Sequence, residues 1–461
     1  MPGNWDLIVI GGGAAGLGAA RAGADAGARV LLVSEGEIGG ECTFTGCVPS
    51  KTLIEAAARG ATFPAAMTAV LHAVAAIAAT ETPEALAADG IEVLRGRAMF
   101  TSSREIGVDG HVLRARGFVV ATGSQPAVPP VSGLAGVDYL TNETIFDLGE
   151  LPGALAVLGG GPVGCELAQA FARLGSQVTL IEAAPRLLPA ADPEASRVLA
   201  EVFRAEGISV RTGVAAAHVK DGGKGVVVTL PGGEELTADR LLVATGRGPV
   251  TGRLGLQAAG IRQDERGCIL TDRHLATTAA GIYAAGDVTG RMPFTHAAFA
   301  MGRLAARNAL RRPWSPPGSF ATGAIPWVVF TDPEVAQVGL TETQAARSRP
   351  GARVAYLPMS EADRAVTAAR TDGFVKIIAG RRHILGDTGG GRVLGATIVA
   401  PRAGEMIHEP ALAMRAGLFT GRLAQATHAY PTWSLAIQQA TAQFFGQSGG
   451  RTARPARPTP D

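Results

Sequence analysis

Charged residues are scarce in this sequence, and the two signs nearly cancel. Asp, Glu, Lys and Arg make up 18% of the 461 residues, and 42 basic against 40 acidic residues leave a formal net charge of +2. A chain without a basic excess lacks the electrostatic signature of proteins that bind nucleic acid or an anionic membrane. We therefore expect neither partner. Lysine is rare, and Lys51 is the only lysine inside a motif.

Cysteine is also scarce, and long hydrophobic runs are missing. Four cysteines in 461 residues are too few for a disulfide framework, and Met1–Asp6 lacks the basic region of a signal peptide. The most apolar long stretch, Ala65–Ala79, is mostly alanine and is shorter than the roughly 20 residues that span a bilayer. We interpret it as a buried or domain-packing helix, and we expect a soluble, cytoplasmic protein.

Hydrophobic residues and glycine are, by contrast, abundant. Hydrophobic residues make up 47% of the chain, which is enough for packed cores and excludes wholesale disorder. At roughly 100–200 residues per domain, a chain of this length is expected to form several domains. The 62 glycines show no collagen-like period and indicate many tight turns and close backbone approaches, which nucleotide-binding folds need.

Two segments far apart in the sequence look alike. Each begins with a short apolar strand, Leu7–Ile10 or Ala154–Leu158, and continues through a glycine-rich turn into a helix and a second strand. Each later reaches an apolar run ending in Ala-Thr-Gly, with Thr122 and Gly123 in the first unit and Gly246 in the second. Such units predict parallel sheets covered by helices on both faces. The glycines of the two turns are Gly11, Gly13 and Gly16, and Gly159, Gly161 and Gly164.

A Gly-x-Gly-x-x-Gly turn between a strand and a helix is typical of dinucleotide binding. The glycines let the backbone approach a pyrophosphate, and the helix N-terminus offers N–H groups and partial positive charge. An acidic residue at the end of the second strand is expected to bind ribose hydroxyls. That residue is Glu182 in the second unit; in the first, the same offset falls on Ser34, and Glu35 follows directly. Because a carboxylate repels a 2′-phosphate, Glu182 favours NADH over NADPH, although Arg186 lies close by.

The chain from Phe320 onward has no glycine fingerprint. It mixes short apolar strands with helices, which predicts a separate α+β domain. The end of the chain is rich in glycine, proline and arginine and is expected to be disordered. The expected strands are Trp327–Phe330, Phe374–Ile378 and Arg392–Val399, and the expected helices are Glu405–Ala416 and Ser434–Phe445.

The sharpest motif is Gly39–Lys51, in which Cys42 and Cys47 lie five positions apart between glycines. A metal site would need further soft ligands, and the motif has no histidine or third cysteine. Packing of both thiols as small hydrophobic groups is a second alternative. A redox-active pair explains more, because a helix N-terminus lowers a thiol pKa and a short loop lets the sulfurs meet. Cys165 and Cys268 stand alone and are expected to be inert buried thiols.

With these motifs, the sequence resembles the pyridine nucleotide–disulfide oxidoreductases over about residues 5–446. These are two-dinucleotide flavoproteins that include lipoamide dehydrogenase, glutathione reductase and mercuric reductase. The cysteine motif is similar to their active-site disulfide. Thr277–Asp287 is similar to their second FAD motif, Thr295–Ala298 to the segment beside the flavin, and Ile325–Glu334 to the start of their dimerisation domain.

The resemblance implies an α/β fold with two Rossmann-like dinucleotide-binding domains, one for FAD and one for NAD(P), and a C-terminal α+β dimerisation domain. FAD would bind at the first glycine turn, with Asp287 on its ribityl chain and His296 beside the flavin, and NADH or NADPH at the second. The resemblance also implies a homodimer. The expected division is 1–147 for FAD binding, 148–270 for NAD(P) binding, 271–320 for a return to the FAD domain, 321–446 for dimerisation and 447–461 for a disordered tail.

The resemblance also assigns chemical roles. Cys47 would be the thiolate against the flavin, and Cys42 the thiol that attacks the substrate. Lys51 would lie near flavin N5, paired with Glu166; a buried lysine needs such a partner, and a cation stabilises negative charge on a reduced flavin. Electrons would pass from NADH to FAD, then to the disulfide, and then to a small-molecule or protein-bound dithiol/disulfide substrate.

The C-terminal part departs from the family pattern in one place. Disulfide reductases of the family carry His-Pro there, with a glutamate five residues after the histidine, and this pair handles protons across the dimer. Here Tyr430 takes the position of the histidine and Leu435 that of the glutamate. A phenol with a pKa near ~10 is a poor base at neutral pH. His428, two residues away, is the alternative base.

Several functions therefore stay open. A lipoamide dehydrogenase-like activity is the leading hypothesis, and mercuric reductase-like activity is weakened because residues 446–461 contain no cysteine pair. A diaphorase would instead reduce quinones or metal ions at the flavin. A flavin-bearing redox sensor would use Cys42 and Cys47 as a conformational switch with little turnover.

Overall fold

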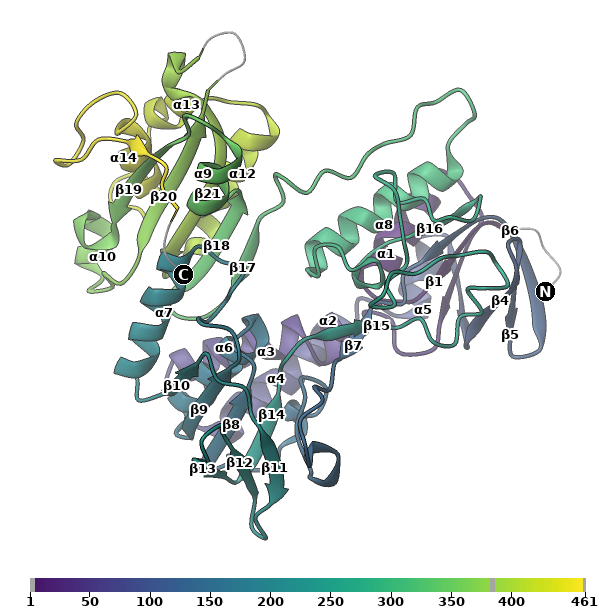
Figure 1. Ribbon diagram of the computed structural model, residues 1–461. Coiled ribbons are helices and arrows are strands. Elements are labelled where there is room, and N and C mark those ends of the chain that lie inside the picture. Colours follow the sequence, from purple (N-terminus) through teal and green to yellow (C-terminus); the bar gives the residue numbers. More distant parts are fainter. Residues whose placement is uncertain (1–4, 382–385, 459–461) are drawn as a thin grey trace.

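The computed structural model describes residues 5–381 and 386–458 and forms three lobes (Figure 1). The first lobe contains β1 (Trp5–Ile10), α1 (Ala14–Asp25), β2 (Val30–Ser34), β3 (Ile91–Arg95), β4 (Ala98–Ser102), β5 (Glu105–Val108), β6 (His111–Val120), β16 (Ile282–Ala284) and α8 (Thr295–Leu310). Its sheet has the order β3-β2-β1-β6-β5-β4, with β16 also paired to β6. Helices α1 and α8 lie side by side and approach closely at Gly302. A Cβ at this position would lie 1.9 Å from the carbonyl oxygen of Ala15, so only glycine permits the approach.

The second lobe repeats this plan on a smaller scale. It contains β8 (Ala154–Leu158), α6 (Pro162–Leu174), β9 (Gln177–Glu182), α7 (Pro193–Ala205), β10 (Ser209–Thr212), β11 (His218–Asp221), β12 (Val226–Thr229), β13 (Glu235–Ala238) and β14 (Arg240–Val243). A parallel sheet has the order β10-β9-β8-β14, and β11-β12-β13 form an antiparallel sheet. Helix α6 follows β8 as α1 follows β1, which confirms the two predicted strand–turn–helix units. The antiparallel pair of β7 (Ser124–Pro126) and β15 (Arg247–Pro249) joins the two lobes.

Four helices lie between β2 and β3 in the chain. They are α2 (Gly40–Phe44), α3 (Cys47–Ala58), α4 (Phe63–Ala78) and α5 (Pro83–Ala88). Helix α3 packs against α6 of the second lobe, and Leu53 of α3 and Phe171 of α6 share one buried core. The cysteine motif, which occupies α2 and the start of α3, is therefore held against the second dinucleotide unit.

The apolar stretch Ala65–Ala79 forms most of α4. One face packs toward α3 through Phe63 and Val70. The opposite face carries Leu71, which is 65% exposed, and Ile77, which is 40% exposed. The expected helix is confirmed, but it is buried on one side only.

Among the described residues, one stretch, Phe63–Ala88, is long and apolar enough by composition to qualify as a candidate membrane span. It is divided into α4 and α5, and the 16 residues of α4 measure about 24 Å at 1.5 Å per residue. The hydrocarbon core of a bilayer is about 30 Å thick, so α4 alone is too short to cross it.

The third lobe is an antiparallel sheet with helices against it. It contains β17 (Trp327–Val329), β18 (Glu334–Gly339), α9 (Glu342–Ser348), β19 (Arg353–Pro358), α10 (Asp363–Thr367), β20 (Phe374–Gly380), β21 (Arg392–Ala400), α11 (Ala403–Met406), α12 (His408–Arg415), α13 (Thr420–Gln425), α14 (Leu435–Ala442) and β22 (Arg454–Pro455). The sheet order is β17-β18-β21-β20-β19-β22. The three expected strands are confirmed. The expected helix Glu405–Ala416 is divided into α11 and α12 at Ile407, and the expected helix Ser434–Phe445 corresponds to α14.

The described end of the chain is ordered, which corrects the prediction of a disordered tail over 447–461. Strand β22 pairs antiparallel with β19. The guanidinium of Arg454 pairs with the buried carboxylate of Glu342, and that of Arg451 lies 2.6 Å from the carboxylate of Glu361. The arginines and prolines that suggested disorder thus form ion pairs and an edge strand. Residues 459–461 lie outside the described residues.

The second lobe ends earlier than the predicted boundary at residue 270. Strand β14 is the last strand of its sheet, and β15 already pairs with β7. Leu254 and Ile269 pack in the same buried core as Ile8 and Phe118 of the first sheet. Apolar packing therefore assigns the segment after β15 to the first lobe.

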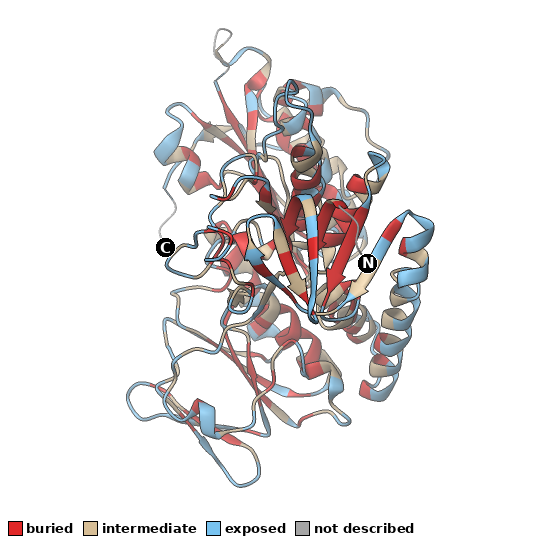
Figure 2. Cartoon of the chain, turned by 90° about the vertical axis from the view of Figure 1, so that its right-hand side faces the viewer, coloured by how far each residue is buried: buried red, intermediate tan, exposed pale blue. Residues whose placement is uncertain are grey.

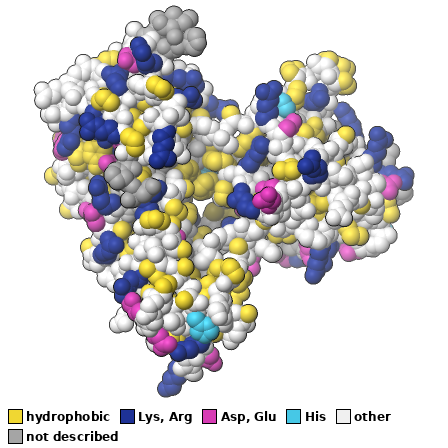
Figure 3. Space-filling model, viewed as in Figure 1, with side chains coloured by type: hydrophobic (Ala, Val, Ile, Leu, Met, Phe, Trp, Pro, Cys, Tyr) yellow, Lys and Arg dark blue, Asp and Glu magenta, His cyan; other side chains and the backbone are white. Residues whose placement is uncertain are grey.

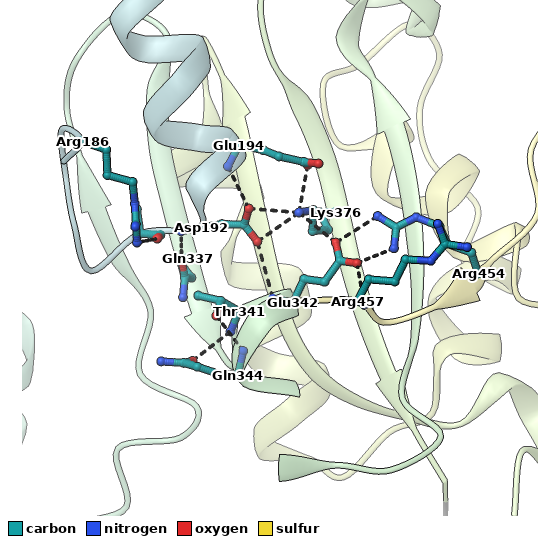
Figure 4. Close-up of polar contacts among 11 residues, drawn as sticks. Arg186, Asp192, Glu194, Gln337, Thr341, Glu342, Gln344, Lys376, Arg454 and Arg457 are labelled. Carbon is teal, nitrogen blue, oxygen red and sulfur yellow. Dashed lines mark hydrogen bonds and ion pairs between the residues drawn. The ribbon is translucent and has the colours of Figure 1, made fainter. Parts of the chain in front are cut away.

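A buried charge cluster joins the second and third lobes (Figure 4). Lys376 on β20 is fully buried, and its ammonium lies 3.0 Å from both carboxylate oxygens of Asp192. It also lies 2.9 Å from Glu194 and 3.1 Å from Glu342. Arg454 from the chain end adds a second cation against Glu342. Two cations thus face three carboxylates in an interior where an unpaired charge costs several kcal/mol.

Buried residues and most charged side chains occupy different parts of the molecule. Buried residues concentrate in the strands and on the helix faces packed against them, while loops and outer faces are exposed (Figure 2). Basic and acidic side chains are scattered over the face in Figure 3 rather than gathered in one field, and the surface is hollowed where the lobes meet.

Candidate active site

The first glycine turn forms an open cradle at a helix N-terminus. A Cβ on Gly16 would lie 1.8 Å from the carbonyl oxygen of Gly11, so glycine is required for α1 to start this close to β1. A Cβ on Gly13 would meet nothing within 4 Å, and Gly13 is the N-cap of α1 without a side-chain cap. This helix end is therefore shaped to receive an anion such as a pyrophosphate.

A cavity of about 780 Å³ opens above this turn. It extends from Glu35 after β2 to Cys47 at the start of α3, and Thr122, Gly123 and Asp287 also line it, as the sequence predicts. A cavity that is lined by a phosphate cradle, a carboxylate and two sulfurs fits FAD. The residues that would hold FAD are Gly11, Gly13, Glu35, Lys51, Thr122, Gly123 and Asp287.

Glu35, rather than Ser34, offers the carboxylate at the far end of this cavity. Ser34 is buried, and its hydroxyl donates to the carbonyl oxygen of Gly36 at 2.9 Å. The carboxylate of Glu35 accepts from Nε of Arg97 at 3.0 Å, and this hydrogen bond holds the pKa of Glu35 below its usual value. Arg97 carried no signal in the sequence, because it comes from the loop after β3.

The second glycine turn has the same geometry as the first. A Cβ on Gly164 would lie 1.8 Å from the carbonyl oxygen of Gly159, and Gly161 again has open space and no side-chain cap. A larger cavity of about 1600 Å³ opens here, and Glu182 and Gly246 line it. The cradle and the lining fit a nicotinamide dinucleotide.

Glu182 is fixed at the end of β9 by two backbone groups. Its carboxylate accepts from the N–H of Gly160 at 2.5 Å and from the N–H of Ala184 at 2.6 Å. Arg186 donates to the carbonyl oxygen of Pro189 at 2.7 Å, within its own loop. The predicted ribose ligand is thus held rigidly, with the nearby cation engaged locally.

The two motif cysteines meet at one hydroxyl. Oγ1 of Thr295, at the start of α8, lies 3.2 Å from Sγ of Cys47 and 3.3 Å from Sγ of Cys42. Both cysteines are free thiols and are partly buried. The sequence placed Thr295 in the segment beside the flavin, but its contact with both sulfurs depends on tertiary packing and had no sequence signal.

The surroundings make the two thiols unequal. A hydrogen bond from the Cys42 thiol, opposed by burial and aided by the charge of Lys51, lowers the pKa of Cys47 to about 6. The same hydrogen bond, with burial, raises the pKa of Cys42 well above its usual value. At neutral pH, Cys47 is therefore the thiolate and Cys42 the thiol that stabilises it.

The predicted pair of Lys51 and Glu166 is also brought together. The ammonium of Lys51 lies 2.7 Å from Oε2 of Glu166, and Oε1 accepts from the N–H of Phe330 at 2.9 Å. The ammonium also lies 4.8 Å from the ring centroid of Phe330. Burial opposes the charge, but Glu166 and Cys47 outweigh it, so the pKa of Lys51 lies above its usual value.

A second cation reaches the cysteine motif from the second lobe. Arg247, directly after the second Ala-Thr-Gly, forms a bidentate ion pair with Glu41, with 2.6 Å between Nη1 and Oε1. Asn142 donates to the same oxygen at 2.5 Å. Nε of Arg247 donates to the hydroxyl of Ser124 at 2.8 Å, and that hydroxyl donates to Asp287 at 2.6 Å. Sequence reasoning missed Glu41, Asn142 and Arg247.

The two candidate bases differ in their surroundings. Tyr430 is 71% exposed, and the carboxylate of Asp363 holds the pKa of its phenol above the usual value. Nε2 of His428 lies 3.0 Å from the carboxylate of Glu409, and Nδ1 lies 3.0 Å from the carbonyl oxygen of Ala426. His428 thus belongs to a histidine–carboxylate pair whose acidic member the sequence did not indicate. Neither candidate lines the two cavities of its own chain.

The expected position of His296 beside the flavin stays a prediction. His296 lines the second cavity and not the first, its Nε2 lies 2.7 Å from the carbonyl oxygen of Pro326, and its ring stacks on that of Phe294 with 5.9 Å between centroids. Successive side chains of a helix point in different directions, so Thr295 faces the sulfurs and His296 faces away.

Comparisons with known proteins agree with this arrangement. Residues 5–302 match the family model for pyridine nucleotide-disulphide oxidoreductases, and residues 325–441 match the model for their dimerisation domain. A dihydrolipoyl dehydrogenase of Thermus scotoductus is 37% identical over 96% of this chain and 98% of its own. A mercuric reductase of Streptomyces lividans is 37% identical over 96% of both chains. The HOCl-induced flavoprotein disulfide reductase RclA from Escherichia coli, also solved as a Cu(II) complex, is similar with a TM-score of 0.86, at 31% identity over 95% of this chain and 99% of its own.

Proposed function

The chain belongs to the pyridine nucleotide-disulphide oxidoreductase family, whose members use FAD and NAD(P)H, and we propose that it passes electrons from NADH through the Cys42–Cys47 pair to a dithiol/disulfide substrate. The observation that carries the proposal is that both thiols contact the hydroxyl of Thr295 and line the same cavity as the first glycine turn. FAD, when held at the first glycine turn and beside Lys51, would supply the hydride-accepting chemistry between NADH and the disulfide. The chain's own groups position the sulfurs, balance charge and move protons.

The two sulfurs have different tasks in this proposal. Cys47, held as a thiolate beside Lys51, would be the sulfur next to FAD, which would leave Cys42 to attack the substrate. Cys42 first gives its proton to a base. Its thiolate then breaks the substrate disulfide and forms a mixed disulfide with one half, while the other half leaves and takes up that proton from the base. Cys47 then attacks Cys42, releases the second thiol and closes the Cys42–Cys47 disulfide. Lys51, fixed by Glu166, holds a positive charge beside the cavity throughout.

We propose NADH as the electron donor. The carboxylate of Glu182 is fixed by backbone N–H groups, so it is ready to accept from a ribose 2′-OH and would repel a 2′-phosphate. Arg186, the one argument for NADPH, donates to carbonyl oxygens of its own loop.

An anaerobic titration with NADH tests the proposal. We expect two-electron reduction to produce a long-wavelength charge-transfer band, because the Cys47 thiolate would lie against the flavin. The pKa of Cys47 is lowered from 9.0 to about 6, so the thiolate is present above that pKa and the band should fade as the pH falls through it. A reduced flavin without any such band well above this pKa would contradict the assignment, and a panel of disulfides would then define the substrate.

For the proton step, we propose His428 of the partner subunit, held by the partner's Glu409. His428→Gln should lower disulfide turnover by about 10²–10⁴-fold, the usual contribution of a positioned base. Tyr430→Phe should change it little, because an exposed phenol with a raised pKa is a poor base. Steady-state rates with a disulfide and with a quinone distinguish a loss of the proton step from a general loss of activity, since quinone reduction at the flavin should be equal in both variants. A large loss in Tyr430→Phe alone would assign the step to the tyrosine.

Reduction of a thiophilic metal ion or a quinone is a second candidate. Tyr430, a poor base at the position of the family's histidine, favours this candidate, because the reduction of a metal ion releases no thiol that must be protonated. Curated relatives include mercuric reductases, and RclA has been solved with Cu(II). Within the described residues, no group of three or more His, Cys, Asp or Glu could hold a metal ion, so such an ion would be held mainly by the two sulfurs.

The dimerisation domain, residues 325–441, indicates a homodimer. We also propose a cytoplasmic location, because a dithiol that must return to the reduced state in each cycle suits a reducing compartment. The panel of disulfides tests which class of disulfide this enzyme reduces.

A further inference from the structure

The ion pair of Glu41 and Arg247 has no part in the electron path, yet it lies next to Cys42 in the chain. We propose that Glu41 is a positioning residue for the redox-active pair, because it anchors the loop that carries Cys42 to the second lobe. The inference rests on the proposed disulfide chemistry and adds a residue to it.

The anchor holds both ends of the loop between the cysteines. Glu41 lies in α2, a helix of five residues, and helices this short are not stable without tertiary contacts. Its carboxylate is bound by two nitrogens of Arg247 and by Nδ2 of Asn142. The same Nδ2 lies 3.5 Å from the carbonyl oxygen of Thr45, on the side of Cys47. The position of Cys42 therefore depends on these contacts more than on helix stability.

The other end of the anchor is itself fixed. Arg247 begins β15, which pairs with β7 at the junction of the two lobes. Its guanidinium donates to both the hydroxyl and the carbonyl oxygen of Ser124, each at 2.8 Å. Burial raises the pKa of Glu41 although Arg247 and Asn142 oppose this, so the carboxylate sits here at an energetic cost. A partly buried ion pair that is fixed to Ser124 at one end and holds the cysteine loop at the other indicates a positioning role.

Anchoring affects how easily the disulfide closes. When the two thiols lose two electrons and two protons and join, the equilibrium depends on the effective concentration of one sulfur near the other. Thr295 contacts both sulfurs only while Cys42 stays in place. A freer Cys42 would visit more positions in the reduced state, which lowers that effective concentration and makes the pair a weaker reductant.

Glu41→Ala and Glu41→Gln in the FAD-loaded dimer test this. We expect Glu41→Ala to lower the effective concentration about tenfold, which raises the midpoint potential of the pair by about 30 mV for two electrons, and Glu41→Gln to have a smaller effect. The potential is measured by equilibration with glutathione redox buffers and counting of alkylated Cys42 and Cys47. FAD content and NADH-dependent quinone reduction should stay at the wild-type level. The matched control is Glu55→Gln, which removes an exposed carboxylate from the 3.4 Å pair with Arg59 on α3.

Two outcomes would overturn the inference. An unchanged potential in Glu41→Ala would show that the anchor does not position the pair, and a loss of FAD in proportion to the shift would make Glu41 a cofactor ligand instead. A double-mutant cycle combines Glu41→Ala with Arg247→Gln. If Glu41 acts through Arg247, the changes in midpoint potential of the two single variants must not add up in the double variant, and additive changes would show that Glu41 does not act through Arg247. A wild-type protein that reduces no disulfide would reject the proposed function, yet the potentials of its cysteine pair could still be compared.

Discussion

Cys42→Ser should lower disulfide turnover by about 10⁴-fold or more, because removal of a covalent nucleophile leaves only binding and charge effects. A serine hydroxyl cannot form the mixed disulfide. It is nearly the size of the thiol, however, and can still donate to Cys47 and contact Thr295. The Cys47 thiolate should therefore persist, and the charge-transfer band should be present before any NADH is added. Rates with a disulfide, together with the spectrum of the resting enzyme, provide the measurement.

The control for this change is Cys268→Ser. Cys268 is buried, and desolvation raises its thiol pKa, so it is expected to be inert. The substitution Cys268→Ser removes one thiol and leaves the cysteine motif intact, so disulfide turnover should be retained. Disulfide turnover that persists in Cys42→Ser would refute the assigned nucleophile. Quinone turnover that persists alone, in a wild-type enzyme inactive on disulfides, would indicate a diaphorase. Redox-dependent partner binding without turnover would indicate a sensor.

Lys376→Met should have the largest effect on stability, a loss of about 3–5 kcal/mol in the free energy of unfolding, which is typical when one partner of a buried ion pair is removed. The ammonium is fully buried, and although burial opposes its charge, Asp192 and Glu194 hold the pKa of Lys376 above its usual value. Methionine has a similar volume but no charge. Asp192, Glu194 and Glu342 would then face one another, with the guanidinium of Arg454 still paired with Glu342 (Figure 4).

The expected loss depends on pH. Burial raises the pKa of Glu342, but Arg454 and Lys376 outweigh it and leave the pKa below its usual value. A lowered folded-state pKa gives stability that is present above the unfolded pKa and is lost as the pH falls through the folded one. The difference between wild type and Lys376→Met should therefore shrink in acid. Urea unfolding of FAD-loaded dimers at one protein concentration measures it, because both FAD and dimer formation shift apparent stability.

Lys220→Met is the matched control for this prediction. Lys220 pairs with Glu235 at 2.7 Å, but both side chains are about half exposed, and exposed pairs contribute about 0–1 kcal/mol. The stability loss in Arg454→Gln should fall between the losses in Lys376→Met and Lys220→Met, since the side chain of Arg454 is 37% exposed while its partner Glu342 is buried. Equal stability of Lys376→Met and wild type at neutral pH would mean that the carboxylates take up protons at little cost.

The two dinucleotide units could be predicted because their geometry is local. In each turn the third glycine is required by the carbonyl oxygen of the first, Gly16 against Gly11 and Gly164 against Gly159, and both of these first glycines have a positive φ, so the local spacing specifies the turn. The cysteine motif was recognisable for the same reason. Lys51 and Glu166 came from family resemblance, and their contact follows from the packing of α3 on α6.

The contacts that the sequence did not indicate join residues far apart in the chain. Thr295 reaches the cysteines, and Arg247 reaches Glu41, only because the lobes fold together. Glu409 supports His428 from helix α12, whereas the family pattern has its glutamate after the histidine. The ordered chain end was missed because composition predicts disorder and carries no information about distant partners.

Strand β22 has a practical consequence for the integrity of the enzyme. It covers the outer side of β19, where Arg353 and Val354 would otherwise present unpaired backbone groups to solvent. Open sheet edges recruit strands from other molecules. Proteolytic trimming of a dozen terminal residues would thus leave the catalytic sulfurs untouched and yet turn a well-dispersed protein into one prone to aggregate.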